Sequence, residues 1–284
     1  MKTYVLACID GSTYSPAVCD AAAWASLRLE APLSFLHVLH KGQEAKGDDL
    51  SGSIGFGAQE SLLEELASLD EQRGKLAMER GRQMLLAARE RARAAGVVEP
   101  EGRQRHGDLV QTLTELEAGV RLLVLGRRGE AADVASEHLG SHLERVIRSL
   151  HRPILMTPPE FSAPQRVMIA FDGSATTLKG VEMVAGSPLF RGLPCHLVMV
   201  GGDSAEARAQ LAKARKTLEE AGFEAPAVML SGEVEKSLRQ YQKDQGIDLI
   251  IMGAYGHSRI RHLLIGSTTT ELMRRSAVPL LLLR

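Results

Sequence analysis

The sequence lacks several features that mark particular protein classes. It has 3 cysteines in 284 residues, and these lie at positions 8, 19 and 195, with no CxxC or Cys/His spacing. This pattern favours reduced thiols buried as small apolar residues over disulfides or metal ligands, as is usual in the cytosol. The formal net charge is −1. With so small a charge there is no global basic field to attract a nucleic acid or an anionic membrane, and we expect neither as a partner.

Long apolar runs are also missing. The opening segment "MKTYVLACIDGS" has too short an apolar stretch for a secretory signal, and no run elsewhere approaches the ~18 residues of a membrane span. The sequence therefore predicts a soluble, cytoplasmic protein.

The motifs of several nucleotide-dependent enzymes are absent as well. A dinucleotide dehydrogenase needs G-x-G-x-x-G after its first strand, where this chain has only Gly11, and the P-loop signature does not occur. No nucleophile stands at a spacing that suggests a relay with a base. We therefore identify no catalytic residue and no metal ligand, and at most slow ATP hydrolysis remains open.

What the chain does have is an internal repeat. "YVLACIDGS" at 4–12 matches "RVMIAFDGS" at 166–174, and "LLVLGRRG" at 122–129 matches "LIIMGAYG" at 249–256. The repeat predicts two domains, 1–158 and 165–284. A linker with three prolines, 157–165, joins the two copies.

Within each copy, short apolar runs alternate with helical patterns, which is typical of βαβ units around a parallel sheet. We predict strands in the second copy near 166–171, 195–201, 226–230, 247–252 and 278–283. A capped helix is predicted within 203–222. The predicted fold class is α/β, with two tandem doubly wound domains, each a five-stranded parallel sheet flanked by helices.

The first copy carries an insertion near 41–74. Its start is polar and rich in glycine, typical of a loop, whereas Leu62, Leu63, Leu66 and Leu69 follow at helical spacing. We favour an amphipathic helix that covers its own domain. The alternative is a protrusion that contacts a partner.

Glycines follow the fourth strand of the second copy. Gly253 and Gly256 lack side chains that would keep a ligand from the backbone, and Gly266 and Ser267 stand where a helix is predicted to begin. Free amides and the positive end of a helix dipole favour a phosphate there. The hydroxyls of Ser267, Thr268 and Thr269 add further donors.

The spacing G-x2-G-x9-G-[ST] resembles the nucleotide-binding signature of the universal stress protein family, and both copies together resemble a tandem member of it. The resemblance implies an adenine-nucleotide alpha-hydrolase-like fold that binds ATP or AMP, with or without magnesium. It also implies that Asp172 holds the nucleoside and that Val200 lines the adenine pocket. The implied binding set is Asp172, Val200, Met252, Gly253, Gly256, Gly266, Ser267, Thr268 and Thr269.

Each of these residues also has a simpler interpretation. The Asp-Gly-Ser sequence at 172–174 is a common way to turn the chain and cap a helix. The loop residues His257, His262, Arg259 and Arg261 are expected to be solvated rather than functional.

The first copy departs from the signature. Its weaker candidate set is Asp10, Val38, Gly126, Gly129, Gly140 and Ser141, with one residue too many between the second and third glycines. Two of the hydroxyls are lost, since Ser141 is followed by His142 and Leu143. Arg127 and Arg128 crowd the first turn, and we expect them either to grip a phosphate or to fill the site.

Two functional hypotheses remain. One is a stress-response regulator that binds an adenine nucleotide mainly in its C-terminal domain, and the other is a dimerisation scaffold with vestigial sites. The apolar final strands of the two copies, at 152–158 and 278–283, are predicted to lie at sheet edges. Because exposed edges invite pairing, we expect the copies to dock as an internal pseudo-dimer, and a homodimer is left open.

Overall fold

The computed structural model describes residues 3–39, 56–129, 141–254 and 267–283, with backbone alone at 56–64, 141–142 and 267–268. Its N-terminal half contains, in chain order, β1 Tyr4–Cys8, α1 Ser15–Leu29, β2 Leu33–Leu39, α2 Phe56–Ala94, β3 Glu101–His106, α3 Leu109–Leu116, β4 Val120–Gly126, α4 Ser141–Ser149 and β5 Ile154–Thr157. None of the described helices is long and apolar enough to cross a membrane.

The C-terminal half repeats the same order of elements. It contains β6 Val167–Phe171, α5 Ala175–Gly186, β7 Cys195–Val200, α6 Ala205–Glu220, β8 Ala227–Leu230, α7 Val234–Asp244, β9 Leu249–Gly253, α8 Ser267–Arg275 and β10 Leu280–Leu283. All five strands predicted for this copy are present within one or two residues, and the predicted helix at 203–222 is α6, capped by Ser204.

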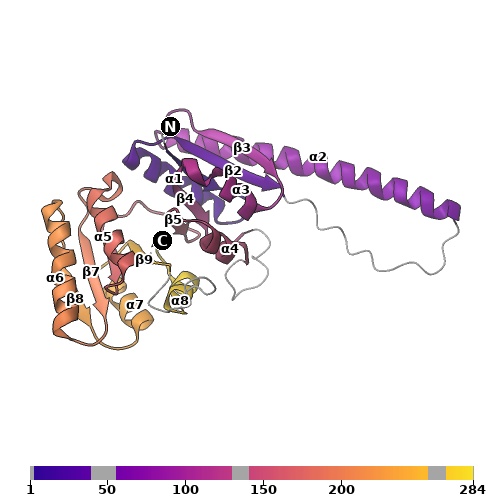
Figure 1. The fold of residues 1–284 in the computed structure, drawn as a ribbon. Helices are drawn as coiled ribbons and strands as arrows, with labels where there is room; N and C mark the ends of the chain where they lie inside the picture. The colour runs from indigo at the N-terminus through magenta and orange to yellow at the C-terminus, as the bar shows by residue number, and fades with distance from the viewer. Residues whose placement is uncertain (1–2, 40–55, 130–140, 255–266, 284) are drawn as a thin grey trace.

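All ten strands form one sheet in the order β3-β2-β1-β4-β5-β10-β9-β6-β7-β8. Among the strands that the structure describes, those within each half pair in parallel, and β5 pairs antiparallel with β10. Each half is thus a doubly wound, five-stranded unit, as predicted. The helices cover the sheet, and the long α2 extends away from the body (Figure 1).

The final strands join the two halves. Leu280 pairs with Met156 and Leu282 with Ile154 across the antiparallel contact. Other contacts cross between the halves, among them the hydrogen bond that Arg28 Nε on α1 donates to the Leu189 carbonyl at 3.1 Å. Phe161 of the linker lies 5.9 Å from Trp24 of α1, ring centre to ring centre. The expected docking of the two edge strands is therefore confirmed.

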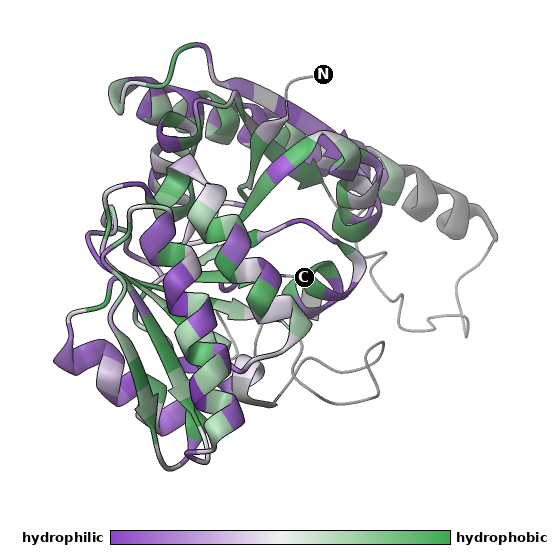
Figure 2. Cartoon of the chain, turned by 60° about the vertical axis from the view of Figure 1, so that its left-hand side comes forward, coloured by the Kyte–Doolittle hydropathy of each residue, from purple (hydrophilic) through white to green (hydrophobic). Residues whose placement is uncertain are grey.

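Two apolar layers lie on opposite faces of the sheet. Along β1, Val5 and Ala7 join one cluster of buried side chains, whereas Leu6 joins the other. Both clusters include residues from both halves, so the core is continuous through the junction. Figure 2 shows this as hydrophobic strands between helices whose outer faces are largely hydrophilic.

The insertion lengthens α2. This helix has 39 residues, whereas its counterpart α6 has 16. Its later part packs on the body, through residues such as Leu85, Ala88 and Ala92, whereas each residue from 65 to 80 is exposed. Our expectation that this helix covers its own domain is therefore wrong for residues 65–74 of the insertion. The start of the insertion, 40–55, lies outside the described residues.

Candidate functional site

The carboxyl ends of three neighbouring strands meet in the C-terminal half. β6 ends at Phe171, β7 at Val200 and β9 at Gly253. The register sets Ala170 beside Met252 and Phe171 beside Met199, so these ends lie along one edge of the sheet. Ligands of open α/β sheets bind at this edge. The structure therefore brings together four members of the expected set: Asp172, Val200, Met252 and Gly253.

Asp172 begins the turn that follows β6. Its Oδ1 accepts the Ser174 backbone N–H at 2.9 Å and the Thr177 hydroxyl at 2.7 Å. Ser174 then caps α5 by accepting the Thr177 backbone N–H. The simpler capping interpretation of this Asp-Gly-Ser sequence is confirmed. Asp172 is nevertheless exposed, so its carboxylate faces the solvent at the sheet edge.

A glutamine that the sequence analysis missed lies against the same turn. Gly173 has φ of 73°, a conformation that favours glycine, and a Cβ placed there would lie 2.1 Å from Oε1 of Gln210. Gln210 belongs to α6, and only the fold brings it to the turn. It adds an amide to the polar groups beside Asp172.

The end of β9 is tied to the start of α8. The Thr269 hydroxyl donates to the Gly253 carbonyl at 3.2 Å, and Thr269 is buried. Its hydroxyl therefore links helix and strand. Ser267 and Thr268 form the first turn of α8. Gly256 and Gly266 lie outside the described residues, as do His257, His262, Arg259 and Arg261.

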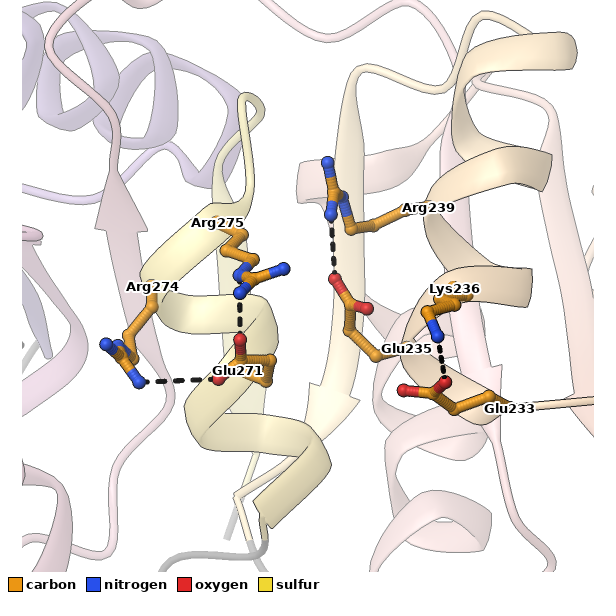
Figure 3. Close-up of polar contacts among 7 residues, drawn as sticks. All are labelled: Glu233, Glu235, Lys236, Arg239, Glu271, Arg274 and Arg275. Carbon is orange, nitrogen blue, oxygen red and sulfur yellow. Dashed lines mark hydrogen bonds and ion pairs between the residues drawn. The ribbon is translucent and has the colours of Figure 1, made fainter. Parts of the chain in front are cut away.

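Packing of apolar side chains holds α8 on the body, and ion pairs run along the helix itself. Leu272 and Met273 are fully buried, and Glu271 pairs with Arg275 at 2.7 Å and with Arg274 at 3.5 Å. The neighbouring helix α7 has its own pair, in which the buried Glu235 accepts from Arg239 at 3.0 Å (Figure 3). A fixed α8 gives the sheet edge a helix N-terminus of defined position, where backbone N–H groups attract anions.

The equivalent edge of the N-terminal half is filled by the protein's own side chains. A Cβ placed on Gly126 would lie 2.7 Å from Cβ of the buried Tyr14, and one on Gly129 would lie 2.8 Å from Oδ2 of Asp10. These two glycines therefore make room for Tyr14 and Asp10. At the repeat shift of 162, Tyr14 corresponds to Thr176, which is much smaller.

Helix α2 adds to this filling. A Cβ placed on Gly11 would lie 2.9 Å from Sδ of Met84 and 3.2 Å from a terminal nitrogen of Arg80. Val38, at the end of β2, is half-buried beside this cover. Gly140 lies outside the described residues, and Ser141 begins α4.

Arg127 takes neither of the two roles expected of it. Its guanidinium donates to the Ser276 carbonyl at 2.7 Å, just after α8, and its backbone N–H donates to Thr157 at 3.0 Å. This side chain of the first glycine loop thus reaches into the other half of the protein. Sequence spacing carries no signal for such a contact.

Cys8 lies at the end of β1, near the N-terminal sheet edge. Burial, with the neighbouring Asp10, raises the pKa of Cys8 far above its usual range, so this thiol stays protonated. Among the residues that the structure describes, no three His, Cys, Asp or Glu side chains cluster as a metal site would require.

Comparisons with known proteins agree on one family. A sequence model of the universal stress protein family matches residues 1–158 and 196–284. Universal stress protein Slr1230 of Synechocystis is 39% identical over 284 residues, which is 99% of each chain. Universal stress protein MJ0577 of Methanocaldococcus jannaschii is 29% identical over 79 residues, 28% of this chain and 49% of its own.

Among solved structures, a universal stress protein from Archaeoglobus fulgidus superposes with a TM-score of 0.72 at 20% identity, covering 99% of this chain and 98% of its own. That likeness supports the fold alone. The family match covers most of the chain, and the Synechocystis relative is similar over its full length. The chain belongs to the universal stress protein family.

Proposed function

We propose that this protein is a stress-response regulator that binds an adenine nucleotide, ATP or AMP, mainly in its C-terminal domain. We take the two domains to span 1–158 and 165–284. The observation that carries the proposal is the difference between the two sheet edges. At the first edge the buried Tyr14 lies against Gly126, whereas the second edge has the smaller Thr176 at the matching position and an exposed Asp172 beside the ends of β7 and β9. In both halves the glycine after the aspartate contacts a helix side chain, Met84 and Arg80 at Gly11 and Gln210 at Gly173, so that contact does not distinguish the two edges.

Each part of the second edge suits a different part of a nucleotide. The carboxylate of Asp172 accepts hydrogen bonds from the hydroxyls of a ribose. The half-buried Val200 offers apolar surface to an adenine ring, and Met252, which is 5% exposed, backs the site from the core. Gly253 and the first turn of α8 supply backbone and helix-dipole contacts for the phosphates. Gly256 and Gly266 add further backbone contacts, and Ser267 and Thr268 add hydroxyl donors. Magnesium would be held mainly by the phosphates and water, since Mg²⁺ keeps several of its waters.

The scaffold hypothesis is the second candidate, and one observation favours it. The single sheet that passes through both halves, closed by the β5–β10 contact, joins the two domains into a pseudo-dimer through backbone pairing of the chain's own strands. A protein of this kind would keep its shape and its partners with no nucleotide present.

Identifying the small molecule that accompanies the purified protein separates the two hypotheses. Protein purified under native conditions is denatured, and the released fraction is analysed by mass spectrometry. We expect an adenine nucleotide from the wild type and its loss in Gly253→Val, because a branched side chain blocks close approach to the backbone. A wild-type protein that releases no nucleotide and whose melting temperature does not rise with ATP and magnesium supports the scaffold.

A further inference from the structure

The part of α2 that leaves the body exposes large apolar side chains. We call residues 65–80 the α2 arm. Leu66, Leu69, Leu76 and Met78 on this arm are 48%, 44%, 70% and 49% exposed. Leu66, Leu69 and Leu76 are spaced by three and seven residues, which places them on one stripe of the helix, and Met78 lies off that stripe. An apolar stripe at this spacing is typical of a helix that packs on another helix.

The arm also has little to stabilise it as a single helix. Its contacts with the body lie at its base, where the Met78 carbonyl accepts from Nε2 of Gln104 at 3.3 Å and Arg80 lies against Gly11. All of its residues are exposed, and Gly74 in its middle has no atom within 4 Å of the position of a Cβ. Helices without tertiary contacts are marginal in water, and glycine weakens them further. A second helix along the stripe would supply the missing packing.

The charges of the arm and its base are segregated along the helix. Residues 65–71 contain three acids, Glu65, Asp70 and Glu71, and no base, whereas residues 73–82 contain four bases and one acid. A helix with acids at one end and bases at the other is complementary to a copy of itself that runs in the opposite direction. In a parallel pair the like charges would lie side by side and repel.

From this stripe and this charge pattern we propose that the α2 arm is a dimerisation element, which pairs antiparallel with the α2 arm of a second copy of this chain. The two copies are then related by a two-fold axis that crosses the arms. Such an interface is closed, because each acidic segment meets the basic segment of the other copy and no arm is left to recruit a third.

The ion pairs already present within the arm are compatible with this pairing. Lys75 lies 2.7 Å from Glu71 and Arg73 lies 3.7 Å from Asp70, and all four side chains are more than two-thirds exposed. Exposed pairs of this kind contribute little to stability. They can therefore be shared with, or exchanged for, partners on a second helix at small cost.

The first test is the mass of the full-length protein in solution, by sedimentation equilibrium from low micromolar to submillimolar concentration. We expect a monomer–dimer equilibrium in the wild type. Replacing both Leu69→Glu and Leu76→Glu should raise the dimer dissociation constant at least about tenfold, since it places charges in the stripe. Met78→Glu is the matched control, because it changes an equally exposed apolar residue of the same arm, and it should leave the constant nearly unchanged.

Charge reversal tests the direction of pairing. An acid-to-base variant, Glu65→Lys with Asp70→Lys, and a base-to-acid variant, Arg73→Glu with Lys75→Glu, should each dimerise poorly alone. An equimolar mixture of the two should form a heterodimer. Lost ion pairs within one helix cannot be restored by mixing, so recovery in the mixture reports contacts between chains.

Three outcomes would overturn the proposal. One is a wild type that stays monomeric over the whole range. A second is a dimer unaffected by the two leucine substitutions. The third is a dimer dissociation constant that is the same for each charge variant as for the wild type. That result would indicate parallel pairing or another surface. The nucleotide released from the protein is measured separately, so failure here leaves the proposed function untouched.

Discussion

The guanidinium of Arg127, in the glycine loop of the N-terminal half, donates a 2.7 Å hydrogen bond to the carbonyl of Ser276 in the C-terminal half. Ser276 directly follows α8, so a positive charge lies at the negative end of that helix. The opposite end of α8 borders the candidate nucleotide site. A residue that the sequence suggested for phosphate binding instead fixes the helix of the other site.

Replacing Arg127 should therefore weaken the junction of the two halves. We expect Arg127→Ala to lower the free energy of unfolding by about 1.5 kcal/mol, the lower end for a hydrogen bond from a charged donor. Urea denaturation followed by circular dichroism measures the change. Lys213→Ala, an exposed cation on α6, is the control and should fall within about 0.5 kcal/mol of the wild type. Equal stability of the two variants would show that the Ser276 contact is unimportant.

Gly126 should tolerate no side chain. A methyl group there would lie 2.7 Å from Cβ of Tyr14, which is buried and has no room to withdraw. We expect Gly126→Ala to destabilise the fold by about 1–3 kcal/mol, as other overpacked substitutions do. Nucleotide affinity should stay unchanged, since the proposed main site lies in the other half. A thermal melt with and without ATP measures both quantities, and loss of the ATP-dependent shift would contradict the assignment.

Acid should destabilise the protein through His196. Burial, and then the positive charge of Arg166, lower the pKa of this imidazole from its ordinary 6.5, and its Nδ1 lies 2.8 Å from the Tyr241 hydroxyl. The unfolded chain binds the proton more readily, so the contribution of neutral His196 is complete above pH 6.5 and is lost progressively as the pH falls from there toward the lower pKa of the folded state. We expect the unfolding free energy of His196→Gln to depend less on pH between 7 and 5. If the free energy of unfolding changes with pH equally in the variant and the wild type, His196 does not have this role.

Gly74→Ala should strengthen the α2 arm. The site has open space around it, and alanine favours a helix interior over glycine by about 0.5–1 kcal/mol. Backbone amides of residues 65–80 should exchange with deuterium about two- to fivefold more slowly as a result. Amides of β1, which belong to the core, serve as the internal control. Unchanged exchange in the arm would mean that its helix is stabilised by something other than its own propensity.

Much of the architecture follows from the repeat in the sequence. Gly126 and Gly253 end equivalent strands, and Ser141 and Ser267 begin equivalent helices, at the shifts that the sequence predicts. Apolar strands and capped helices are local patterns, and chain order then restricts how they pack.

The side chains that lie at the two sheet edges could not be predicted from the sequence in the same way. Tyr14 against Gly126, Gln210 against Gly173 and Arg127 against Ser276 are contacts between segments distant in the chain. A glycine in the sequence looks the same whether the space left by its missing side chain holds a ligand or another side chain of the protein. The direction of the α2 arm depends on which part of the helix packs on the body. The helical spacing of its leucines is compatible both with a helix that covers its own domain and with one that protrudes.

The most direct test of the account is a calorimetric titration of the nucleotide-free protein with ATP. We expect one site per chain, with an affinity about tenfold weaker in Asp172→Asn, which loses the charge of one ribose-binding group, and nearly unchanged in Asp10→Asn. Binding weakened by Asp10→Asn and not by Asp172→Asn would place the nucleotide in the wrong half. No heat of binding at millimolar ATP would contradict the proposed function itself.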